Sequence, residues 1–303
     1  MTKVFIDGSA GTTGLRMEER LSNRDDIIQI KLPEDKRKDL AARKQALNSA
    51  DIAFLCLPDA AAMEAVSLVE NEHTAIIDTS TAHRVQEGWV YGMPELSGQR
   101  ERIAAAKRIA NPGCHASGFI ALVEPLVTAG VIAADTPLTA FSLTGYSGGG
   151  KKMIAEYQSN ERVPLLDAPR QYGLGQAHKH LPEMVKVCGL STAPVFCPIV
   201  GDFYAGMEVT VALHGIDKKQ VEEVYYQRYA KGLIRFVAQE SEDGFLSAAT
   251  HVGRDDMTVT VHGNDQRLLL VARFDNLGKG ASGAAIQNMN ILMGVEESKG
   301  LEV

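Results

Sequence analysis

The sequence predicts an α/β protein of about two domains, the first built on a doubly wound parallel sheet and the second on a mixed sheet. The chain has 303 residues, which corresponds to about two domains at roughly 150 residues each. Its first 112 residues alternate short apolar runs with longer helical patterns. From about residue 135 the apolar runs become longer and alternate with polar positions. The first pattern indicates βαβ units, and the second indicates strands with one covered face.

Five short runs are candidates for the strands of the first domain. They span residues 4–6, 27–30, 52–57, 75–77 and 109–110. Most of these runs are apolar throughout, which is typical of parallel strands that helices cover on both faces.

The second half predicts longer strands at residues 208–213, 257–262 and 267–274, with helices at 218–230 and 284–293. The period of two favours a mixed or antiparallel sheet with one wet or interfacial face. Since no low-complexity linker separates the halves and no segment repeats at a fixed period, the two domains are expected to pack closely.

Charge composition bears on the class of partner. Hydrophobic residues make up 45% and charged residues 23% of the chain, and 31 Lys plus Arg against 38 Asp plus Glu give a net charge of −7. No basic run is long enough to follow a phosphate backbone. Nucleic acid is therefore not expected as a partner.

The chain is expected to act in the cytoplasm. Its four cysteines contain no C-x-x-C pair, which indicates reduced thiols. The N-terminus enters the first predicted strand without the pattern of a secretion signal. The most apolar stretch, residues 116–134, is interrupted by Glu124 and Pro125, so no membrane span is expected.

A glycine-rich loop follows the first predicted strand. Residues 8–14 read G-x-x-G-x-x-G and lead into a helix expected to open at about Leu15. Between a first strand and a first helix, such a loop lets backbone N–H groups hold a pyrophosphate. The candidate cofactor-binding residues are Gly8, Gly11, Thr12, Thr13 and Gly14.

The residues after the second strand favour NADP over NAD. NAD enzymes usually place an acid there to hold the ribose 2′-hydroxyl, whereas this chain has Lys31, Lys36, Arg37 and Lys38. A solvated cationic loop is the alternative interpretation.

Cys114 is the candidate nucleophile. It lies in the motif NPGCH at residues 111–115, after a short strand and before an apolar helical pattern. The unsatisfied N–H groups and the positive dipole end of a helix favour a thiolate over a thiol. The remaining cysteines, Cys56, Cys188 and Cys197, are interpreted as structural.

The segment HKHLPE at residues 178–183 supplies two imidazoles and a carboxylate. In an extended segment His178 and His180 would share a face. A histidine with a near-neutral pKa can hold a thiolate and pass a proton to a leaving oxygen. The alternatives are a surface turn and a zinc site. Zinc needs two more ligands, and none lies at a suitable spacing, so no metal is predicted.

Three further segments are candidates for contacts with anionic ligands. Residues 80–84 follow the fourth strand at the carboxyl edge of the sheet, where Arg84 has the geometry to bind a phosphate or carboxylate. Residues 146–152 form a cationic turn that is either an anion site or a hairpin. Residues 275–288 form a glycine-rich lead into the final helix, with a plain helix start as the alternative.

In this order, the segments resemble the N-acetyl-gamma-glutamyl-phosphate reductase family, which belongs with aspartate-semialdehyde dehydrogenase and glyceraldehyde-3-phosphate dehydrogenase. The resemblance spans nearly the whole chain. The chain is similar to the shorter of two forms of the reductase, since residues 80–84 differ from the acidic-aromatic-Arg motif of the longer form. Its markers are residues 8–14, 80–84, 91–96, 111–115, 178–183 and 279–290.

The resemblance implies NADPH-dependent reduction of N-acetyl-L-glutamyl 5-phosphate to the 5-semialdehyde, with release of inorganic phosphate, in arginine biosynthesis. Cys114 would form a thioester, and His178 would act as acid and base beside it. His180 and Glu183 would orient the substrate, and Arg84 would bind its carboxylate or phosphate. The further cofactor-binding residues implied are Ser80, Gly283 and Asn288.

The resemblance also implies the domain organisation. Residues 1–112 and 283–303 would form the NADP-binding Rossmann domain. Residues 113–282 would form a glyceraldehyde-3-phosphate dehydrogenase-like substrate domain. Family members are oligomers, so a homo-oligomer is expected, either a dimer or a tetramer.

A chain of net charge −7 must concentrate cations where it binds anions. Lys151 is therefore predicted to contact the substrate, in a set that also contains Arg84, Lys152 and Lys179. Two alternative functions remain open at this stage. One is another acyl-phosphate reductase such as aspartate-semialdehyde dehydrogenase, and the other is a non-catalytic NADP-binding redox sensor.

Overall fold

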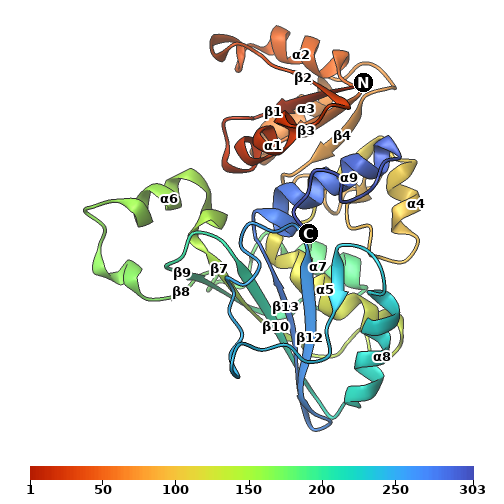
Figure 1. Ribbon diagram of the computed structural model, residues 1–303, viewed down its shortest axis with the longest axis vertical. Coiled ribbons are helices and arrows are strands. Elements are labelled where there is room, and N and C mark those ends of the chain that lie inside the picture. Colours follow the sequence, from red (N-terminus) through yellow and green to blue (C-terminus); the bar gives the residue numbers. More distant parts are fainter. The chain divides into compact units, whose positions relative to one another are not determined.

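The computed structural model describes residues 1–303 and divides the chain into two compact units (Figure 1). Unit 1 comprises Met1–Pro112 and Ala281–Leu301, and unit 2 comprises Gly113–Gly280 and Glu302–Val303. Each unit contains its own sheet. Unit 1 is discontinuous in sequence because the last helix of the chain packs on the first sheet.

Six strands form the sheet of unit 1 in the order β2-β1-β3-β4-β6-β5, and every neighbouring pair is parallel. The strands are β1 (Thr2–Asp7), β2 (Ile27–Ile30), β3 (Ile52–Leu55), β4 (Ala75–Asp78), β5 (Val90–Tyr91) and β6 (Arg108–Ala110). The helices are α1 (Thr12–Ser22), α2 (Leu40–Ser49), α3 (Asp59–Ser67), α4 (Gln99–Ala104), α9 (Gly283–Met293) and the 3₁₀ turn η1 (Glu34–Lys36). The predicted parallel sheet is confirmed.

Helices cover both faces of this sheet. Val4 and Ile6 of β1 point into a core with residues of α1 and α9, whereas Phe5 between them points into a second core with residues of α2 and α3. Successive side chains of a strand point to opposite faces, so a strand buried on both sides must be apolar at every position. This explains the uninterrupted apolar runs of the sequence.

Seven strands form the mixed sheet of unit 2 in the order β11-β12-β13-β10-β7-β9-β8. The strands are β7 (Thr139–Gly145), β8 (Arg170–Gln171), β9 (Val195–Gly201), β10 (Met207–His214), β11 (Ile234–Phe236), β12 (Met257–Asn264) and β13 (Arg267–Phe274). The helices are α5 (Cys114–Thr128), α6 (Gly150–Gln158), α7 (Leu181–Cys188) and α8 (Lys218–Arg228). Short helical turns are η2 (Tyr146–Gly149), η3 (Pro164–Asp167) and η4 (Gly278–Ser282). The predicted mixed sheet is confirmed, whereas residues 146–152 form the turn η2 and the start of α6 rather than a hairpin.

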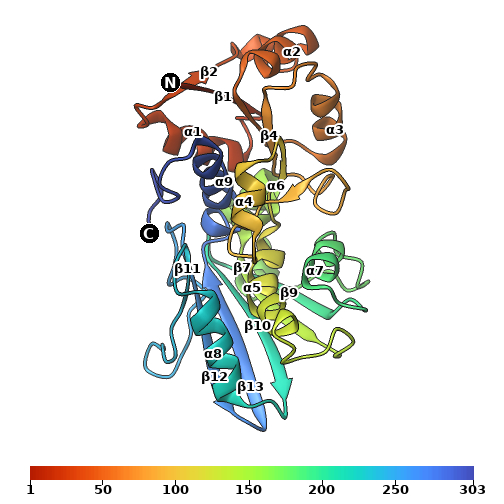
Figure 2. The same cartoon turned by 90° about the vertical axis from the view of Figure 1, so that its right-hand side faces the viewer.

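Helices cover one face of this second sheet. Helix α5 packs on β10 and β13, and α8 packs on β12 (Figure 2). A Cβ atom at Gly118 of α5 would lie 2.6 Å from Val209 and 2.8 Å from Phe274. The glycine therefore lets α5 approach the sheet closely, which fixes where the N-terminus of α5 lies.

The opposite face of the second sheet is only partly covered. Phe141, Val195 and Leu269 lie on it with 48%, 53% and 46% of their surface exposed. Residues 237–256, here called the strap, connect β11 to β12 and cover Arg273 at the end of this face.

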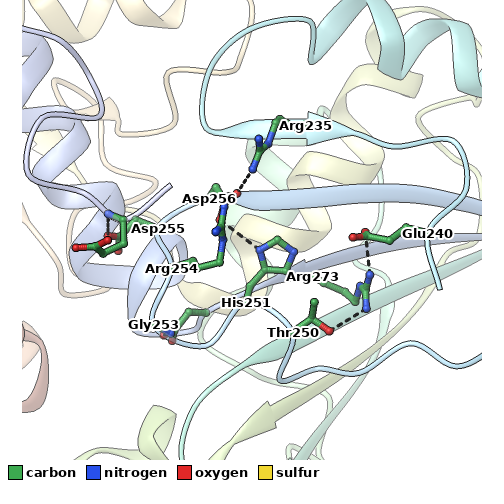
Figure 3. A network of polar contacts seen from close by, with 11 residues as sticks. Arg235, Glu240, Thr250, His251, Gly253, Arg254, Asp255, Asp256 and Arg273 are labelled. Atoms are coloured by element: carbon green, nitrogen blue, oxygen red, sulfur yellow. Dashed lines mark hydrogen bonds and ion pairs between the residues drawn. The ribbon is translucent and has the colours of Figure 1, made fainter. Parts of the chain in front are cut away.

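Ion pairs hold the strap in place (Figure 3). Arg273 is almost fully buried and pairs with Glu240 at 2.8 Å and Glu242 at 2.6 Å. Asp256 accepts contacts from Arg254 at 2.8 Å, from His251 at 3.3 Å and from Arg235. Arg235 belongs to β11 and Arg273 to β13, whereas the carboxylates that they contact belong to the strap. The network therefore ties the strap to the sheet.

None of the helices combines the length and the apolar composition needed to cross a membrane.

Candidate active site

The loop between β1 and α1 in unit 1 forms a cradle of backbone groups. Gly8 has φ +85°, and a Cβ atom there would lie 2.3 Å from the carbonyl oxygen of Cys56. Helix α1 begins at Thr12, three residues before the expected Leu15, and its N-cap Gly11 makes no side-chain hydrogen bond. Uncapped N–H groups at a helix N-terminus suit a phosphate. The predicted residues in this loop and the first turn of α1 are Gly8, Gly11, Thr12, Thr13 and Gly14.

A cavity of about 590 Å³ adjoins this cradle within unit 1. Lys31, Arg37 and Lys38 line it together with Glu18, Glu34 and Asp35, and Lys31 pairs with Glu18 at 2.7 Å. Leu57 and Ala61 contribute an apolar wall. Lys36, the fourth cation of the predicted set, is not among the lining residues. A cavity with an apolar wall and with Arg37 and Lys38 at its edge suits an adenosine that carries a phosphate.

The carboxylate at the end of β1 is neutralised beside this cavity. Asp7 is buried and accepts hydrogen bonds from Arg43 at 3.0 and 3.1 Å. Arg43 also pairs with Glu64 at 2.8 Å. Burial raises the pKa of Asp7, although the Arg43 guanidinium opposes that shift. Asp7 is therefore paired with Arg43 rather than with the cations of the rim.

The loop after β4 is organised by a buried carboxylate. Asp78 accepts hydrogen bonds from the Ser80 backbone N–H at 2.9 Å and the Ser80 hydroxyl at 2.7 Å. It also bonds His83 Nδ1 at 2.6 Å, and the His83 ring stacks on Trp89 at 4.0 Å. Ser80, predicted to bind cofactor, thus lies in a loop whose shape is fixed internally.

Arg84 is used at least in part to hold backbone. Its Nε donates to the carbonyl oxygen of Asn111 at 2.9 Å, and its Nη2 donates to the carbonyl oxygen of Thr79 at 3.0 Å. The predicted substrate ligand therefore also ties the ends of β4 and β6 together.

Asn288 of α9 presents an unsatisfied acceptor. Its Nδ2 donates to the carbonyl oxygen of Gly92 at 2.9 Å and to Asn111 Oδ1 at 3.3 Å. Its own Oδ1 is buried without a hydrogen-bond partner. Gly283, also predicted to bind cofactor, opens the same helix. A buried acceptor with no partner is costly, and the N–H₂ of a nicotinamide carboxamide is a donor that would satisfy it.

In unit 2, Cys114 is the first residue of α5. Its N-cap is Gly113, which has an extended backbone and makes no side-chain cap. The Cys114 thiol thus lies at the positive end of a buried 15-residue helix, which favours the thiolate. A Cβ atom at Gly280 would lie 3.0 Å from Cys114 Cβ, so the chain before α9 passes close to the cysteine only because glycine occupies that position.

Two other cysteines are poor nucleophiles. Burial raises the pKa of the Cys56 thiol to about 12 and holds the pKa of Cys188 well above its ordinary value. Neither supplies a thiolate at neutral pH.

His178 and His180 lie together, but not in the extended segment that the sequence predicted. Residues 179 and 180 form a turn that leads directly into α7, and Pro182 lies in the first helical turn. Proline is favoured there because the missing N–H needs no partner. The turn brings the two rings to 4.7 Å between centroids, and the His180 backbone N–H donates to His178 Nδ1 at 3.2 Å.

Glu183 holds the backbone before the cysteine. It is buried in the first turn of α7, and its Oε2 accepts a hydrogen bond from the Gly113 N–H at 3.1 Å. It therefore fixes the entry into α5. Lys151 lies exposed in the first turn of α6.

The sequence assigned no role to two residues that complete this cluster. His115 bonds the Ser142 hydroxyl at 2.6 Å and the Tyr172 hydroxyl at 2.7 Å. His115 belongs to the motif around Cys114, and its position next to the candidate nucleophile could have indicated a role in the site. Nothing in the sequence singled out Tyr172. No group of three or more His, Cys, Asp or Glu side chains is arranged to hold a metal ion.

Two family models match the two parts of the chain. Residues 3–106 match the semialdehyde dehydrogenase NAD-binding domain, and residues 114–276 match the semialdehyde dehydrogenase dimerisation domain. A glycine cradle on a parallel sheet and a cysteine at a helix N-terminus on a mixed sheet thus define a nicotinamide-dependent semialdehyde dehydrogenase.

Curated relatives narrow this class. The chain is 46% identical to "N-acetyl-gamma-glutamyl-phosphate reductase 2" of Nostoc sp., with 99% of each chain covered. It is 47% identical to the N-acetyl-gamma-glutamyl-phosphate reductase of Brucella anthropi, covering 96% of this chain and 98% of the relative. The chain belongs to the N-acetyl-gamma-glutamyl-phosphate reductase family.

Solved structures agree on the fold. An aspartate semialdehyde dehydrogenase II from Vibrio cholerae, in complex with ASA, matches with a TM-score of 0.72 at 16% identity, covering 97% of this chain and 98% of that chain. The aspartate semialdehyde dehydrogenase of Candida albicans, solved with NADP, matches with a TM-score of 0.71 at 16% identity over the same shares.

Proposed function

We propose that the chain reduces N-acetyl-L-glutamyl 5-phosphate to N-acetyl-L-glutamate 5-semialdehyde through a thioester on Cys114. The carboxylate-derived carbon of an acyl phosphate is activated towards attack by a thiolate, and phosphate is its leaving group. The carrying observation is that Cys114 opens α5 and that the next residue, His115, packs against the rings of His178 and His180 at 5.4 and 5.5 Å, in a chain 46% identical to named reductases.

The bonds and charges balance as follows. The Cys114 sulfur attacks the acyl carbon, the C–S bond forms and the C–O bond to phosphate breaks. The thioester carbon would then accept a hydride, which NADPH would supply when bound. The resulting oxyanion on Cys114 collapses to the aldehyde and releases the thiolate. One proton is consumed, and it ends on the released phosphate.

His178 is the proposed donor of that proton. Since its Nδ1 accepts the His180 N–H, the neutral ring carries its own proton on Nε2. That N–H can stabilise the oxyanion by a hydrogen bond, and once the ring has taken up a second proton from solvent, the imidazolium can protonate the departing phosphate oxygen. His180 and Glu183 fix the turn that carries His178, and Arg84 and Lys151 remain candidates for the anionic ends of the substrate.

NADPH is the proposed cofactor. The cradle around Gly8 would hold the pyrophosphate, and the Asn288 Oδ1 would accept from the nicotinamide carboxamide. The cationic rim formed by Lys31, Arg37 and Lys38 supports a 2′-phosphate, and the Candida albicans structure of the same fold holds NADP. Since the chemistry consumes NADPH and needs a reduced thiol, we propose the cytoplasm as its compartment.

A trapping experiment tests the nucleophile. The purified protein is mixed with N-acetyl-L-glutamyl 5-phosphate in the absence of cofactor, denatured, digested and measured by mass spectrometry. The expected result is an N-acetylglutamyl adduct on the peptide that contains Cys114. An adduct on another cysteine, or none under conditions where NADPH supports turnover, would overturn the proposed thioester.

A substrate panel tests the specificity. The reverse reaction is followed as NADPH absorbance with NADP, phosphate and either N-acetyl-glutamate semialdehyde or aspartate semialdehyde. Turnover of the N-acetylated aldehyde is expected. Turnover of aspartate semialdehyde alone would reassign the chain to the related dehydrogenase, and cofactor binding without any turnover would indicate a redox sensor.

A second copy of the chain is the proposed cover for the open face of the second sheet. The segment matches a dimerisation domain, and Phe141, Val195 and Leu269 expose apolar surface on that face. Replacing Phe141 with Lys is expected to shift the protein towards the monomer in sedimentation velocity. An unchanged sedimentation coefficient would remove this face from the interface. Whether the assembly is a dimer or a tetramer is read from the same measurement.

A further inference from the structure

His115 has no role in the chemistry described so far. It is the second residue of α5, directly after Cys114, and only 3% of its surface is exposed. Both of its ring nitrogens are engaged, Nδ1 with the Ser142 hydroxyl of β7 at 2.6 Å and Nε2 with the Tyr172 hydroxyl at 2.7 Å. A buried, fully bonded polar side chain beside a nucleophile indicates a purpose beyond packing.

The His115 ring is neutral. Burial lowers its pKa to about 3, and the nearby charges of His178 and Lys179 act in the same direction. A neutral imidazole has one donor and one acceptor nitrogen. The hydroxyls of Ser142 and Tyr172 must therefore take opposite roles, one donating to the ring and the other accepting from it.

The Tyr172 hydroxyl is held 2.7 Å from the ring of His115, the residue that follows Cys114 in α5. Burial raises the pKa of Tyr172, and the charge of Cys114 raises it further. Tyr172 is therefore a protonated phenol at neutral pH. If Ser142 donates to Nδ1 and Nε2–H donates to the Tyr172 oxygen, the phenol proton is left to point at the sulfur.

The same ring also packs against the proposed acid. The centroids of His115 and His178 lie 5.4 Å apart with an interplanar angle of 87°. His180 and Phe196 pack on His115 at 5.5 and 5.3 Å. Because His115 is neutral, it holds the His178 ring without repelling a proton on it.

We propose that His115 is a positioning residue for the Cys114 thiolate: braced by Ser142, it directs the Tyr172 hydroxyl towards the sulfur and fixes the plane of the His178 ring. The proposal rests on the proposed role of Cys114 as nucleophile. The pKa of the Cys114 thiol can nevertheless be measured without any substrate. The role of His115 and the role of Cys114 as nucleophile can therefore be disproved independently of each other.

Two amide variants separate the two ring nitrogens. An Asn side chain places its amide near the position of Nδ1, and a Gln side chain places it near that of Nε2. His115→Asn therefore keeps the contact to Ser142 and loses the contact to Tyr172, whereas His115→Gln keeps the contact to Tyr172. His214→Asn is the matched control, since His214 is exposed at the end of β10.

The measurement is the pH dependence of Cys114 alkylation by iodoacetamide, located by peptide mass spectrometry on the full chain. His115→Asn is expected to raise the pH midpoint of alkylation by about one unit, the size of one hydrogen bond to a charged group. It should lower kcat about tenfold with little change in KM. His115→Gln should recover most of both losses, and His214→Asn should match the parent.

A second pair of variants tests whether His115 acts through Tyr172. In a Tyr172→Phe background, His115→Asn is expected to cause no further shift of the alkylation midpoint. Additive shifts would overturn the proposal, as would an unchanged midpoint in a folded His115→Asn protein. Should His115→Asn fail to fold, Ser142→Ala, which removes only the brace, must show the same upward shift for the proposal to stand. Thiolate-like alkylation in a parent protein that lacks turnover would support His115 and overturn only the reaction.

Discussion

The candidate sites in the two units differ in how their polar groups are engaged. Unit 1 leaves groups open: the N–H groups at the start of α1 have no side-chain cap, and the buried Asn288 Oδ1 has no partner. Next to Cys114, the groups of unit 2 engage one another: His115 bonds two hydroxyls, and Glu183 holds the Gly113 N–H. A cofactor-binding site needs polar groups whose hydrogen-bond partners the ligand supplies. A reactive thiolate instead needs neighbouring groups that already hold their positions.

This difference has an energetic consequence. Binding energy for the cofactor would come from unit 1, and the reactivity of the sulfur would come from unit 2. Changes in one unit should therefore leave the property of the other nearly intact. Each of the following predictions tests that separation.

Replacing Cys114 with Ser should have the largest effect. The hydroxyl is a far weaker nucleophile than a thiolate, so kcat should fall by about 10⁴-fold or more. NADPH affinity, measured by the fluorescence of the bound cofactor, should change less than about twofold. Cys197→Ser, on a different element of unit 2, is the matched control and should retain turnover. A large loss of NADPH affinity in Cys114→Ser would contradict the separation.

Replacing Gly8 with Ala should abolish cofactor binding while leaving the cysteine reactive. The new Cβ atom would lie 2.3 Å from the Cys56 carbonyl oxygen at φ +85°, so the cradle must move. We expect a loss of NADPH affinity of more than about a hundredfold. Cys114 alkylation should be unchanged. Gly88→Ala is the control, since Gly88 has φ +82° but no atom within 4 Å of the added Cβ, and its NADPH affinity should stay near that of the parent.

Replacing Asp256 with Asn should weaken unit 2 and change its response to acid. Burial would raise the pKa of Asp256, but hydrogen bonds from His251, Arg254 and Arg235 outweigh it and hold the pKa well below its usual range. The folded pKa is depressed, so this carboxylate stabilises the fold above its unfolded pKa of about 4 and loses that contribution as pH falls below it.

The variant should lose about 2 kcal/mol of unfolding free energy at pH 7. It should also show a flatter decline of stability between about pH 5 and 2 than the parent, measured by urea unfolding at each pH. Asp243→Asn, at a strap turn with no ion pair to Asp256, is the control (Figure 3 shows the contacts to Asp256). An equal acid response in parent and variant would show that Asp256 does not carry this stabilisation.

Local patterns predicted most of the fold. Strands β2 and β13 begin and end at the residues that the sequence predicted. A strand that is buried on both faces has apolar residues at every position, and a strand that is buried on one face has them at every second position, so both kinds can be located in the sequence. The two-residue strand β5 escaped notice because so short a segment has no period. The start of α1 was placed three residues late, since Gly11 as N-cap carries no side-chain signal.

The candidate site was predictable only where one short segment forms it. The glycine cradle is such a segment, and so is the start of α5. The contact between His115 and Tyr172 joins residues 57 positions apart, and the bond from the Gly113 N–H to Glu183 spans 70 positions. Such pairs are set by how α5 and α7 pack, which no single segment encodes. The turn at residues 178–180 was mistaken for an extended segment because Pro182 can end one element or open the next.

The smallest predicted effect concerns which nicotinamide cofactor unit 1 prefers. Arg37→Ala combined with Lys38→Ala removes two cations from the rim of the 590 Å³ cavity. The KM for NADPH should rise about tenfold, because the two lost contacts to a phosphate together cost roughly 1.4 kcal/mol at an exposed rim. The KM for NADH, which lacks that phosphate, should change less than about twofold.

Lys36→Ala removes a cation from the same segment that does not line the cavity, so it separates local binding from the general loss of positive charge. It should leave both KM values near those of the parent. Equal increases for NADPH and NADH in the double variant would mean that Arg37 and Lys38 act on the shared part of the cofactor. Arg37 and Lys38 would then serve the pyrophosphate, and the choice between the two cofactors would have to come from another residue of the cavity, such as Ser9.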